Sequence, residues 1–330
     1  MKKRLFAMMT ALALVLSTAA WGGEAQTEAP AAVEIPENAK CVYLSRSLAD
    51  EFGAMIAYDL QAVIEETFPG WSFTIQDSDN DASKQLEYME NAISNNVDVL
   101  IVQPVADSNT LDAAQRAMDA GILVINYEVP FDTENIINPI VYSSFYDSYK
   151  VLMDYAVDVV KENANILVLS GIEGFSATVE REQALEEFLE ARPDVNVLAT
   201  QYAQYETDKA MNIMEDWLQQ YDNIDAVFCL TDTMAIGVCE AYRANNVDST
   251  DVWICGVDSL SNACQYIETG EISASVFRSP RAFSNATVNA INEYYAGTLD
   301  PTAMIMCNND IVVTKDNVAD IEAELAEFMD

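Results

Sequence analysis

The sequence predicts an α/β protein made of two doubly wound lobes, in each of which helices cover both faces of a parallel sheet. Short apolar runs alternate with helix-period segments, and the runs are continuously apolar, as strands buried on both faces must be. The chain of 330 residues is too long for one ordinary core and suits two domains of common size. In such sheets, ligands bind beyond the carboxyl ends of the strands.

The first 20 residues have the pattern of a secretory signal peptide. Basic residues at positions 2–4 precede an apolar stretch at 5–16, and small residues follow. This stretch is too short to span a bilayer, so we expect cleavage after residue 19 or 20 and export of the mature chain.

Residues 21–39 predict a flexible linker, because they show no apolar periodicity. The junction LSTAAWGG resembles a bacterial lipoprotein lipobox in which Trp21 stands where the lipidated cysteine would be. No lipid can be attached there without a thiol. We therefore expect a free extracytoplasmic protein, in the periplasm or at the extracellular cell surface.

From residue 40 onward, strands and helices alternate. Apolar runs rich in β-branched residues predict strands at 41–44, 72–76, 97–102, 123–127, 166–170, 197–201, 226–230 and 252–257. The clearest helix stripes between them are Ile56, Leu60 and Phe68; Leu86, Met89 and Ile93; and Met211, Met214 and Leu218. A last stripe, Val318, Ile321, Leu325 and Phe328, predicts a C-terminal helix that packs on a lobe.

The net charge of −38 at pH 7 argues against partners that are themselves anionic. Such a field repels nucleic-acid phosphates and anionic lipid headgroups, so we expect neither as a partner. High acidity otherwise serves solubility.

The cysteines and the absence of histidine bear on metal and enzyme chemistry. The six cysteines form no CxxC pair, so we expect no metal site and no cofactor, and mostly buried free thiols, with one or two disulfides left open. Catalysis without histidine or a GxSxG motif would need paired carboxylates such as Asp232 and Asp258. Because ligand binding would explain these acids equally well, we expect no enzyme activity.

The stretch VFCLTDTMAIG (227–237) places Thr231, Asp232 and Thr233 where a buried strand ends and a helix begins. One of these side chains can cap the helix. The others are placed to bind a ligand at the sheet edge.

Similar polar segments recur at other predicted strand ends. They are LSRSLADEFG (44–53), VQPVADSN (102–109), INYEVP (125–130), VYSSFYDS (141–148), LSGIEGFSATVERE (169–182), ICGVDSLSNA (254–263) and SASVFRSPRAFSN (273–285). In this order and spacing, over about residues 40–313, they resemble the periplasmic sugar-binding proteins of the ribose/galactose type, the substrate-capturing component of ABC importers. TDTMAIG and GVDSLSNA together carry most of the resemblance.

The resemblance implies a type I periplasmic binding protein, with two lobes joined by a three-strand hinge that closes on the ligand. The crossings would fall near 143–144, 278–279 and 306–309. The N-terminal lobe would comprise 40–143 plus 279–307, and the C-terminal lobe 144–278 plus 308–330.

The resemblance also implies a ligand site. Such proteins stack the sugar ring on aromatic side chains and bind its hydroxyl groups with charged or amide groups. The matching positions, with nearby residues of the same chemistry, are Arg46, Phe52, Gln103, Glu128, Ser143, Arg181, Tyr205, Thr231, Asp232, Asp258 and Arg278.

Some positions depart from the pattern of ribose binders. Val129 stands where an arginine is usual, Val257 where an aromatic residue is usual, and Arg278 where ribose binders have glutamine. These departures indicate a site for a monosaccharide or sugar acid that is not the site of a ribose binder. The added guanidinium favours a ligand with a carboxylate or many acceptors, such as a sugar acid, although neutral sugars also bind arginine. Arg181 lies early in its helix, where the dipole disfavours a cation, so Glu173, Glu180, Glu182 or a ligand should compensate it.

The sequence therefore predicts a monomeric, extracytoplasmic substrate-binding protein that delivers a small sugar or sugar-like ligand to the permease of an ABC importer. A binding protein that docks on a membrane receptor or histidine kinase remains the alternative, because both classes use the same closed form.

Overall fold

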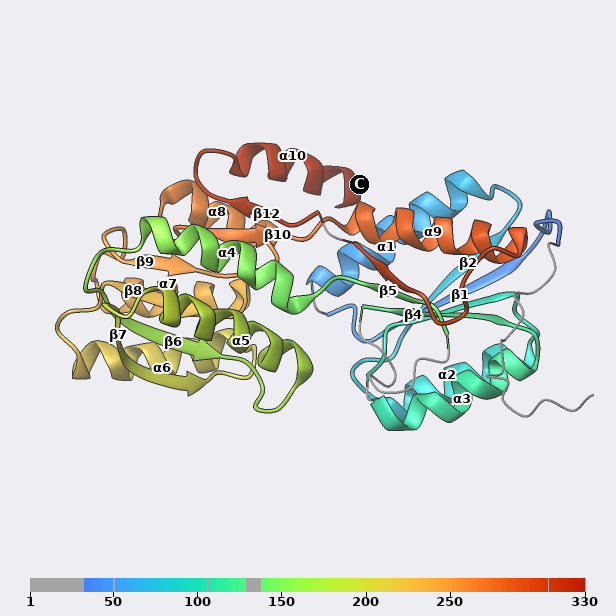
Figure 1. Ribbon diagram of the computed structural model, residues 1–330, viewed down its shortest axis with the longest axis horizontal. Coiled ribbons are helices and arrows are strands. Elements are labelled where there is room, and N and C mark those ends of the chain that lie inside the picture. Colours follow the sequence, from blue (N-terminus) through green and yellow to red (C-terminus); the bar gives the residue numbers. More distant parts are fainter. Residues whose placement is uncertain (1–32, 50, 106, 129–137, 308, 330) are drawn as a thin grey trace, which may run out of the picture.

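The computed structural model describes residues 33–49, 51–105, 107–128, 138–307 and 309–329, and it contains two lobes side by side (Figure 1). The predicted signal peptide, the start of the predicted linker, Val129 and the side chain of Phe328 lie outside the described residues. Residues 33–39 of the predicted linker run along the first lobe. There the Val33 N–H donates to the Tyr295 carbonyl at 2.7 Å, and the Trp71 indole donates to the Pro36 carbonyl at 2.9 Å.

The first lobe holds a parallel sheet in the order β11-β5-β4-β3-β1-β2. Its strands are β1 (Lys40–Ser45), β2 (Ser72–Asp77), β3 (Val99–Val102), β4 (Leu123–Tyr127), β5 (Ile140–Tyr142) and β11 (Met304–Met306). Helices α1 (Glu51–Thr67) and α9 (Pro280–Ala296) cover one face, and α2 (Ala82–Ser94) and α3 (Asp107–Asp119) cover the other (Figure 1).

Successive side chains of a strand point to opposite faces of the sheet, so each strand contributes to the apolar core on both faces. Tyr43 and Ile101 belong to the cluster that includes Leu60 of α1. Their neighbours Leu44 and Leu100 pack with α2 and α3. The strands are therefore apolar on both sides, as the sequence predicts.

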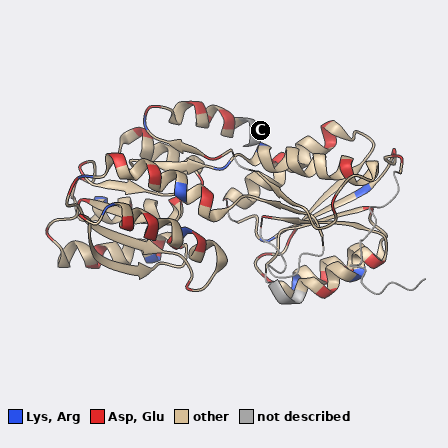
Figure 2. Ribbon diagram, viewed as in Figure 1, with Lys and Arg blue, Asp and Glu red and all other residues tan. Residues whose placement is uncertain are grey.

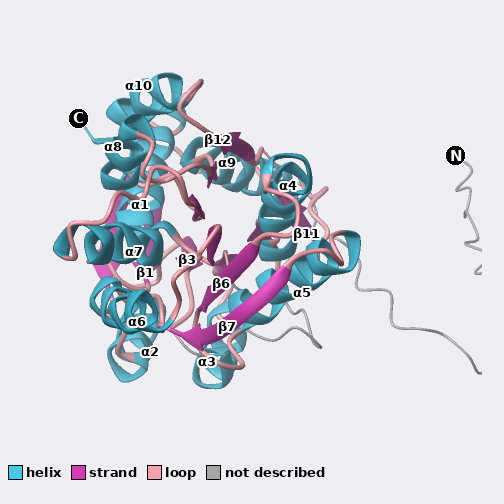
Figure 3. Ribbon diagram, turned by 90° about the vertical axis from the view of Figure 1, so that its left-hand side faces the viewer, coloured by secondary structure: helices cyan, strands magenta, loops and turns pink. Residues whose placement is uncertain are grey.

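The second lobe holds a parallel sheet in the order β7-β6-β8-β9 and an antiparallel pair, β10-β12. The strands are β6 (Asn165–Ser170), β7 (Asn196–Tyr202), β8 (Ala226–Cys229), β9 (Trp253–Cys255), β10 (Ser275–Phe277) and β12 (Ile311–Val313). Single bridges, Cys255 to Ala274 and Asp258 to Phe277, place β10 beside β9. The sheet lies between helices α4 (Phe145–Val159) and α5 (Ser176–Ala191) on one face and α6 (Thr207–Gln220), α7 (Asp232–Ala244) and α8 (Ser261–Thr269) on the other (Figure 3).

The chain passes between the lobes between β5 and α4, between β10 and α9, and between β11 and β12 (Figure 1). The exact residue limits of the lobes given above remain a prediction. Helix α10 (Val318–Met329) packs against α8 of the second lobe and α1 of the first, with Val318, Ile321 and Leu325 buried. It therefore packs on both lobes rather than on one.

The eight predicted strands are all present, although β3, β8 and β9 are shorter than their apolar runs. Acidic residues are spread over the helices and loops of both lobes rather than gathered at one place (Figure 2). All six cysteines are free and buried. In the described part of the chain, no helix is long and apolar enough to cross a membrane.

Candidate functional site

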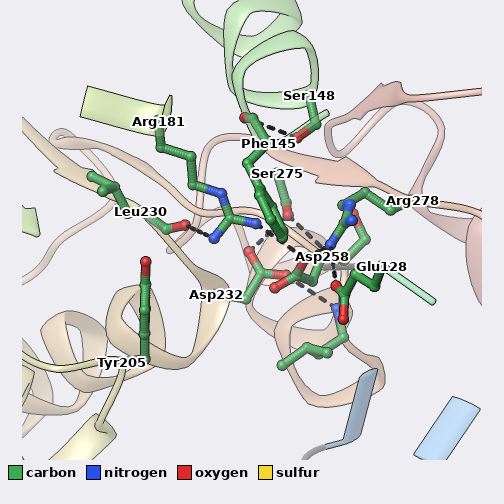
Figure 4. Close-up of polar contacts among 12 residues, drawn as sticks. Glu128, Phe145, Ser148, Arg181, Tyr205, Leu230, Asp232, Asp258, Ser275 and Arg278 are labelled. Carbon is green, nitrogen blue, oxygen red and sulfur yellow. Dashed lines mark hydrogen bonds and ion pairs between the residues drawn. The ribbon is translucent and has the colours of Figure 1, made fainter. Parts of the chain in front are cut away.

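Polar side chains from both lobes converge where the strands end. Gln103 follows β3 and Glu128 follows β4 in the first lobe, while Asp258 and Arg278 follow β9 and β10 in the second. Figure 4 shows Glu128, Asp258 and Arg278 turned toward one another, with Arg181 reaching the same place from α5.

Arg278 is the centre of this group. Its side chain is 1% exposed, and Nη1 lies 3.2 Å from Glu128 Oε1 and 3.5 Å from Asp258 Oδ1. Burial by itself would raise the pKa of Glu128, but the Arg278 guanidinium, with Arg46 and the Gln103 amide, holds that pKa below its usual value. Glu128 is thus held as a carboxylate. One guanidinium therefore joins acids from the two lobes.

Aromatic rings surround the Arg278 guanidinium. Its carbon Cζ lies 4.7 Å from the centre of the Phe52 ring, 5.2 Å from Phe145 and 5.7 Å from Phe283. Ring faces attract a cation, and they also exclude water, which strengthens the ion pairs.

Arg181 forms a second guanidinium contact with Asp258. The Arg181 side chain is buried, its Nη1 donates to the Leu230 carbonyl at 2.8 Å, and its Nη2 lies 3.7 Å from Asp258 Oδ1. Asp258 is therefore the acid that compensates Arg181. Of the candidates expected from the sequence, Glu180 and Glu182 accept hydrogen bonds from Tyr142 and Ser170 instead, while a ligand remains a further candidate partner of Arg181.

Several buried polar atoms around the group have no hydrogen-bond partner among the described residues. They are Nε of Arg181, Nε and Nη2 of Arg278, Oγ1 of Thr231 and Oγ of Ser143. Buried donors are rarely left unpaired, because each costs about 1–3 kcal/mol. A ligand that carries hydroxyl groups would supply acceptors for the guanidinium nitrogens.

Gln103 is held on both sides of its amide. Its Nε2 donates to Glu128 Oε2 at 2.6 Å, and its Oε1 accepts from the Arg46 backbone N–H at 3.0 Å. It thereby fixes the orientation of Glu128, whose backbone has a φ of 67°.

Comparisons with known proteins identify the family of the chain. A profile described as a periplasmic binding protein domain matches residues 50–299, more than half of the chain. The chain belongs to this family of periplasmic binding proteins.

Two curated relatives of this periplasmic binding protein illustrate the similarity. The ribose import binding protein of Bacillus subtilis (strain 168) is 27% identical over 228 residues, which cover 69% of this chain and 73% of the relative. A putative rhizopine-binding protein of Rhizobium meliloti is 27% identical over 268 residues, covering 79% and 86%. These relatives confirm the resemblance to the ribose/galactose type.

Solved structures give the same fold. An ABC transporter solute binding protein from Bacillus halodurans C-125, with bound myo-inositol, has a TM-score of 0.76 and 27% identity, covering 87% of this chain and 98% of that one. A periplasmic solute binding protein from Actinobacillus succinogenes 130z, with bound D-allose, has a TM-score of 0.78 at 20% identity, covering 86% and 99%, and shows the fold alone.

Family membership has two direct consequences. The protein binds a substrate rather than converting one, as the sequence predicts. A periplasmic binding protein is also an exported protein, so the expectation of export is confirmed, while the cleavage position and the absence of a lipid remain predictions.

The remaining predicted residues of the binding protein lie around the central group. Tyr205 lies on the Arg181 side (Figure 4), with its hydroxyl 2.6 Å from Thr178 Oγ1. Its ring lies against Gly171, where a Cβ would come within 2.1 Å of the ring. Asp232 is fully buried, and both carboxylate oxygens accept hydrogen bonds within the second lobe.

Sequence reasoning missed Phe145, Phe283 and Asp310. Phe145 is the ring that contacts both Arg181 and Arg278, and it stands two residues after Ser143 in a segment that the resemblance already marked. Asp310 lines a cavity of about 620 Å³ at the third crossing, with Asp147 and Glu324. Burial raises the pKa of Asp310 to about 6, although Arg278 opposes the shift. Only the folded chain brings Asp310 near the site, so no local signal marked it.

Proposed function

We propose that this protein captures a neutral ring that carries several hydroxyl groups, a monosaccharide or a cyclic polyol, between its lobes and delivers it to an ABC importer. The proposal rests on the buried group formed by Arg181, Arg278, Glu128 and Asp258. Several guanidinium nitrogens in this group have no hydrogen-bond acceptor among the described residues. Carboxylates and guanidiniums form bidentate hydrogen bonds with pairs of neighbouring hydroxyl groups. An aromatic side chain can stack on the C–H face of a sugar or polyol ring.

The charge balance argues for a neutral ligand. Arg278 is paired with Glu128 and Asp258, and Arg181 is paired with Asp258, so the two cations meet two anions. A sugar acid would add a further anion to a buried group whose two guanidiniums already face two carboxylates, and Arg46, the other cation near Glu128, already acts on that carboxylate. The neutral ring thus replaces the sugar acid that the additional arginine suggested.

Import is favoured over sensing because the similar proteins are named as import or ABC transporter binding proteins. The eleven residues predicted from the sequence would form or support the ligand site, with Phe52 as a stacking ring. We also infer that the mature protein begins after residue 19 or 20, carries no lipid and acts as a monomer without nucleic acid. Intact mass and size-exclusion chromatography of the exported protein test these points.

The test is a thermal-shift screen of ligand-stripped mature protein, followed by calorimetry. The panel contains D-ribose, D-allose, D-galactose and myo-inositol, with D-glucuronate and D-gluconate as acids of the same size. A ligand that binds only the folded state raises the melting temperature as its concentration exceeds the Kd. We expect a shift from one or more neutral compounds and none from the acids. A shift confined to the acids would overturn the neutral-ring proposal.

A further inference from the structure

The carboxylate of Asp232 is bound on every side by its own lobe. Asp232 begins α7, and its backbone N–H donates to the Val257 carbonyl at 2.9 Å. Oδ1 accepts from the Ser275 hydroxyl at 2.7 Å, and Oδ2 accepts from the Leu260 N–H at 3.0 Å. The residue is 0% exposed, so its carboxylate is not offered to the space between the lobes.

The turn held by Asp232 has an unusual backbone. Asp258 has a φ of 102° and Ser259 a φ of 47°, so two consecutive residues other than glycine lie at positive φ. Such conformations persist only where the surroundings hold them, and they gather at functional sites.

The three N–H groups of this turn are all bound. The Asp258 N–H donates to the Val276 carbonyl at 2.8 Å, and the Ser259 N–H donates to Ser275 Oγ at 3.2 Å. Since the Ser275 hydroxyl donates its proton to Asp232, its oxygen is left to accept from Ser259. Asp232 therefore holds Leu260 directly and Ser259 through Ser275.

Gly256 shows independently that Asp232 packs tightly against the end of β9. A Cβ at this position would lie 2.1 Å from Asp232 Oδ1 and 2.8 Å from Asp232 Cα. The end of β9 therefore fits the Asp232 carboxylate only because residue 256 has no side chain.

The turn delivers one side chain to the site. Asp258 Oδ1 lies 3.7 Å from Arg181 Nη2 and 3.5 Å from Arg278 Nη1, and Figure 4 shows Asp232 next to it. We propose that Asp232 is a positioning residue that fixes the Asp258–Leu260 turn, so that the Asp258 carboxylate faces both arginines, and that it acts on ligand affinity through Asp258 alone. The part that concerns affinity rests on the proposed function.

The first test needs no ligand. Asp232→Ala removes both carboxylate oxygens and adds no hydrogen-bonding group, so it can hold neither Ser275 nor Leu260. We expect amide hydrogen exchange at Ser259 and Leu260 to become at least about tenfold faster than in the wild type, with β6 unchanged. Asp222→Ala, on the exposed surface of the same lobe, is the matched control and should change nothing. Unchanged exchange in Asp232→Ala would overturn the proposal.

The second test is a double-mutant cycle on ligand affinity. The probe is whichever of D-ribose, D-allose and myo-inositol binds the wild type most tightly in calorimetry. We expect Asp232→Ala to weaken binding about tenfold and Asp258→Asn to weaken it more, while the double variant binds no worse than Asp258→Asn. Losses that multiply would mean that Asp232 acts on the ligand independently of Asp258, and would overturn the proposal.

The two tests separate the inference from the function on which it rests. If the wild type binds none of the probes, the neutral-ring function loses its support, while hydrogen exchange still decides the role of Asp232. If Asp232→Ala does not fold, Ser275→Ala removes only the hydroxyl that joins Asp232 to Ser259. Faster exchange at Ser259 in that variant supports the proposal, and unchanged exchange refutes it.

Discussion

At the scale of single residues, Arg278 balances acids from two lobes with one buried guanidinium. Replacing it by glutamine leaves Glu128 and Asp258 without their shared cation, and an uncompensated buried charge costs about 2 kcal/mol or more. We expect Arg278→Gln to weaken the binding of the neutral ligand by at least about thirtyfold in calorimetry. Arg116→Gln, at a half-exposed surface pair with Glu90, should bind as the wild type does. If Arg278→Gln bound the ligand with nearly unchanged affinity, Arg278 would not be part of the ligand site.

Asp310 makes a prediction about pH. Its pKa is raised to about 6 by burial, against the Arg278 charge and with Asp147 and Asp258 adding to the rise. Because the folded protein holds this proton more tightly than the unfolded chain, the stabilisation is complete below about pH 4 and is lost as the pH rises through about 6.

Comparison with Asp310→Asn isolates this effect from other titrating groups. We expect the variant to gain stability relative to the wild type between pH 4 and pH 7, by roughly 2 kcal/mol after allowance for partial exposure. Urea unfolding of ligand-free protein at both pH values measures the difference. If the free energy of unfolding changed equally between pH 4 and pH 7 in Asp310→Asn and in the wild type, the raised pKa of Asp310 would be contradicted.

At the scale of elements, α8 obtains its N-terminal cap from the other lobe. Leu260 stands at the N-cap position and offers no side-chain hydrogen bond, but Glu51, at the start of α1, accepts from the Ser261 N–H at 2.8 Å. A carboxylate at helix N-termini is stabilised by the helix dipole and by unpaired N–H groups.

Because α1 and α8 belong to different lobes, this bond forms only when the lobes are close. We expect Glu51→Gln to raise the ligand dissociation rate a few-fold, measured by stopped-flow fluorescence, with a smaller effect at high salt. Glu65→Gln, near the other end of α1 and exposed, is the matched control. Equal dissociation rates in the wild type and Glu51→Gln would contradict a role for this cap in closure.

The elements also show what local pattern can predict. The eight strands found from the sequence are continuous apolar runs, whereas β5, β10, β11 and β12 have three residues each and become strands only beside their partners. The predicted strand ends place Glu128 in the first lobe and Asp258 in the second, and the structure brings both to Arg278. The pairing of Arg181 with Asp258 joins α5 to the turn after β9, and no spacing along the chain predicts such a contact.

At the scale of the whole molecule, contacts across the lobes decide how far the protein closes without ligand. Arg278 in the second lobe is paired with Glu128 in the first, and Glu51 with Ser261 adds a second contact. These contacts must break when the lobes separate, so they favour the closed form. A loss of about 1–3 kcal/mol would move an open–closed equilibrium by about fivefold to 150-fold.

Glu128→Gln tests this argument, because the amide keeps the shape of the side chain and removes the charge that Arg278 faces. Spin labels on cysteines introduced at Tyr58 in the first lobe and Val247 in the second, which are 49% and 46% exposed, report the distance between lobes. The six native cysteines are buried and should remain unlabelled in the folded protein. We expect pulsed dipolar spectroscopy to show a longer-distance population in ligand-free Glu128→Gln than in the same labelled protein with Glu128 intact. Glu65→Gln should not produce it. Identical distributions with and without the Glu128 charge would mean that this pair does not set the resting state, and that closure depends on the ligand and the remaining contacts.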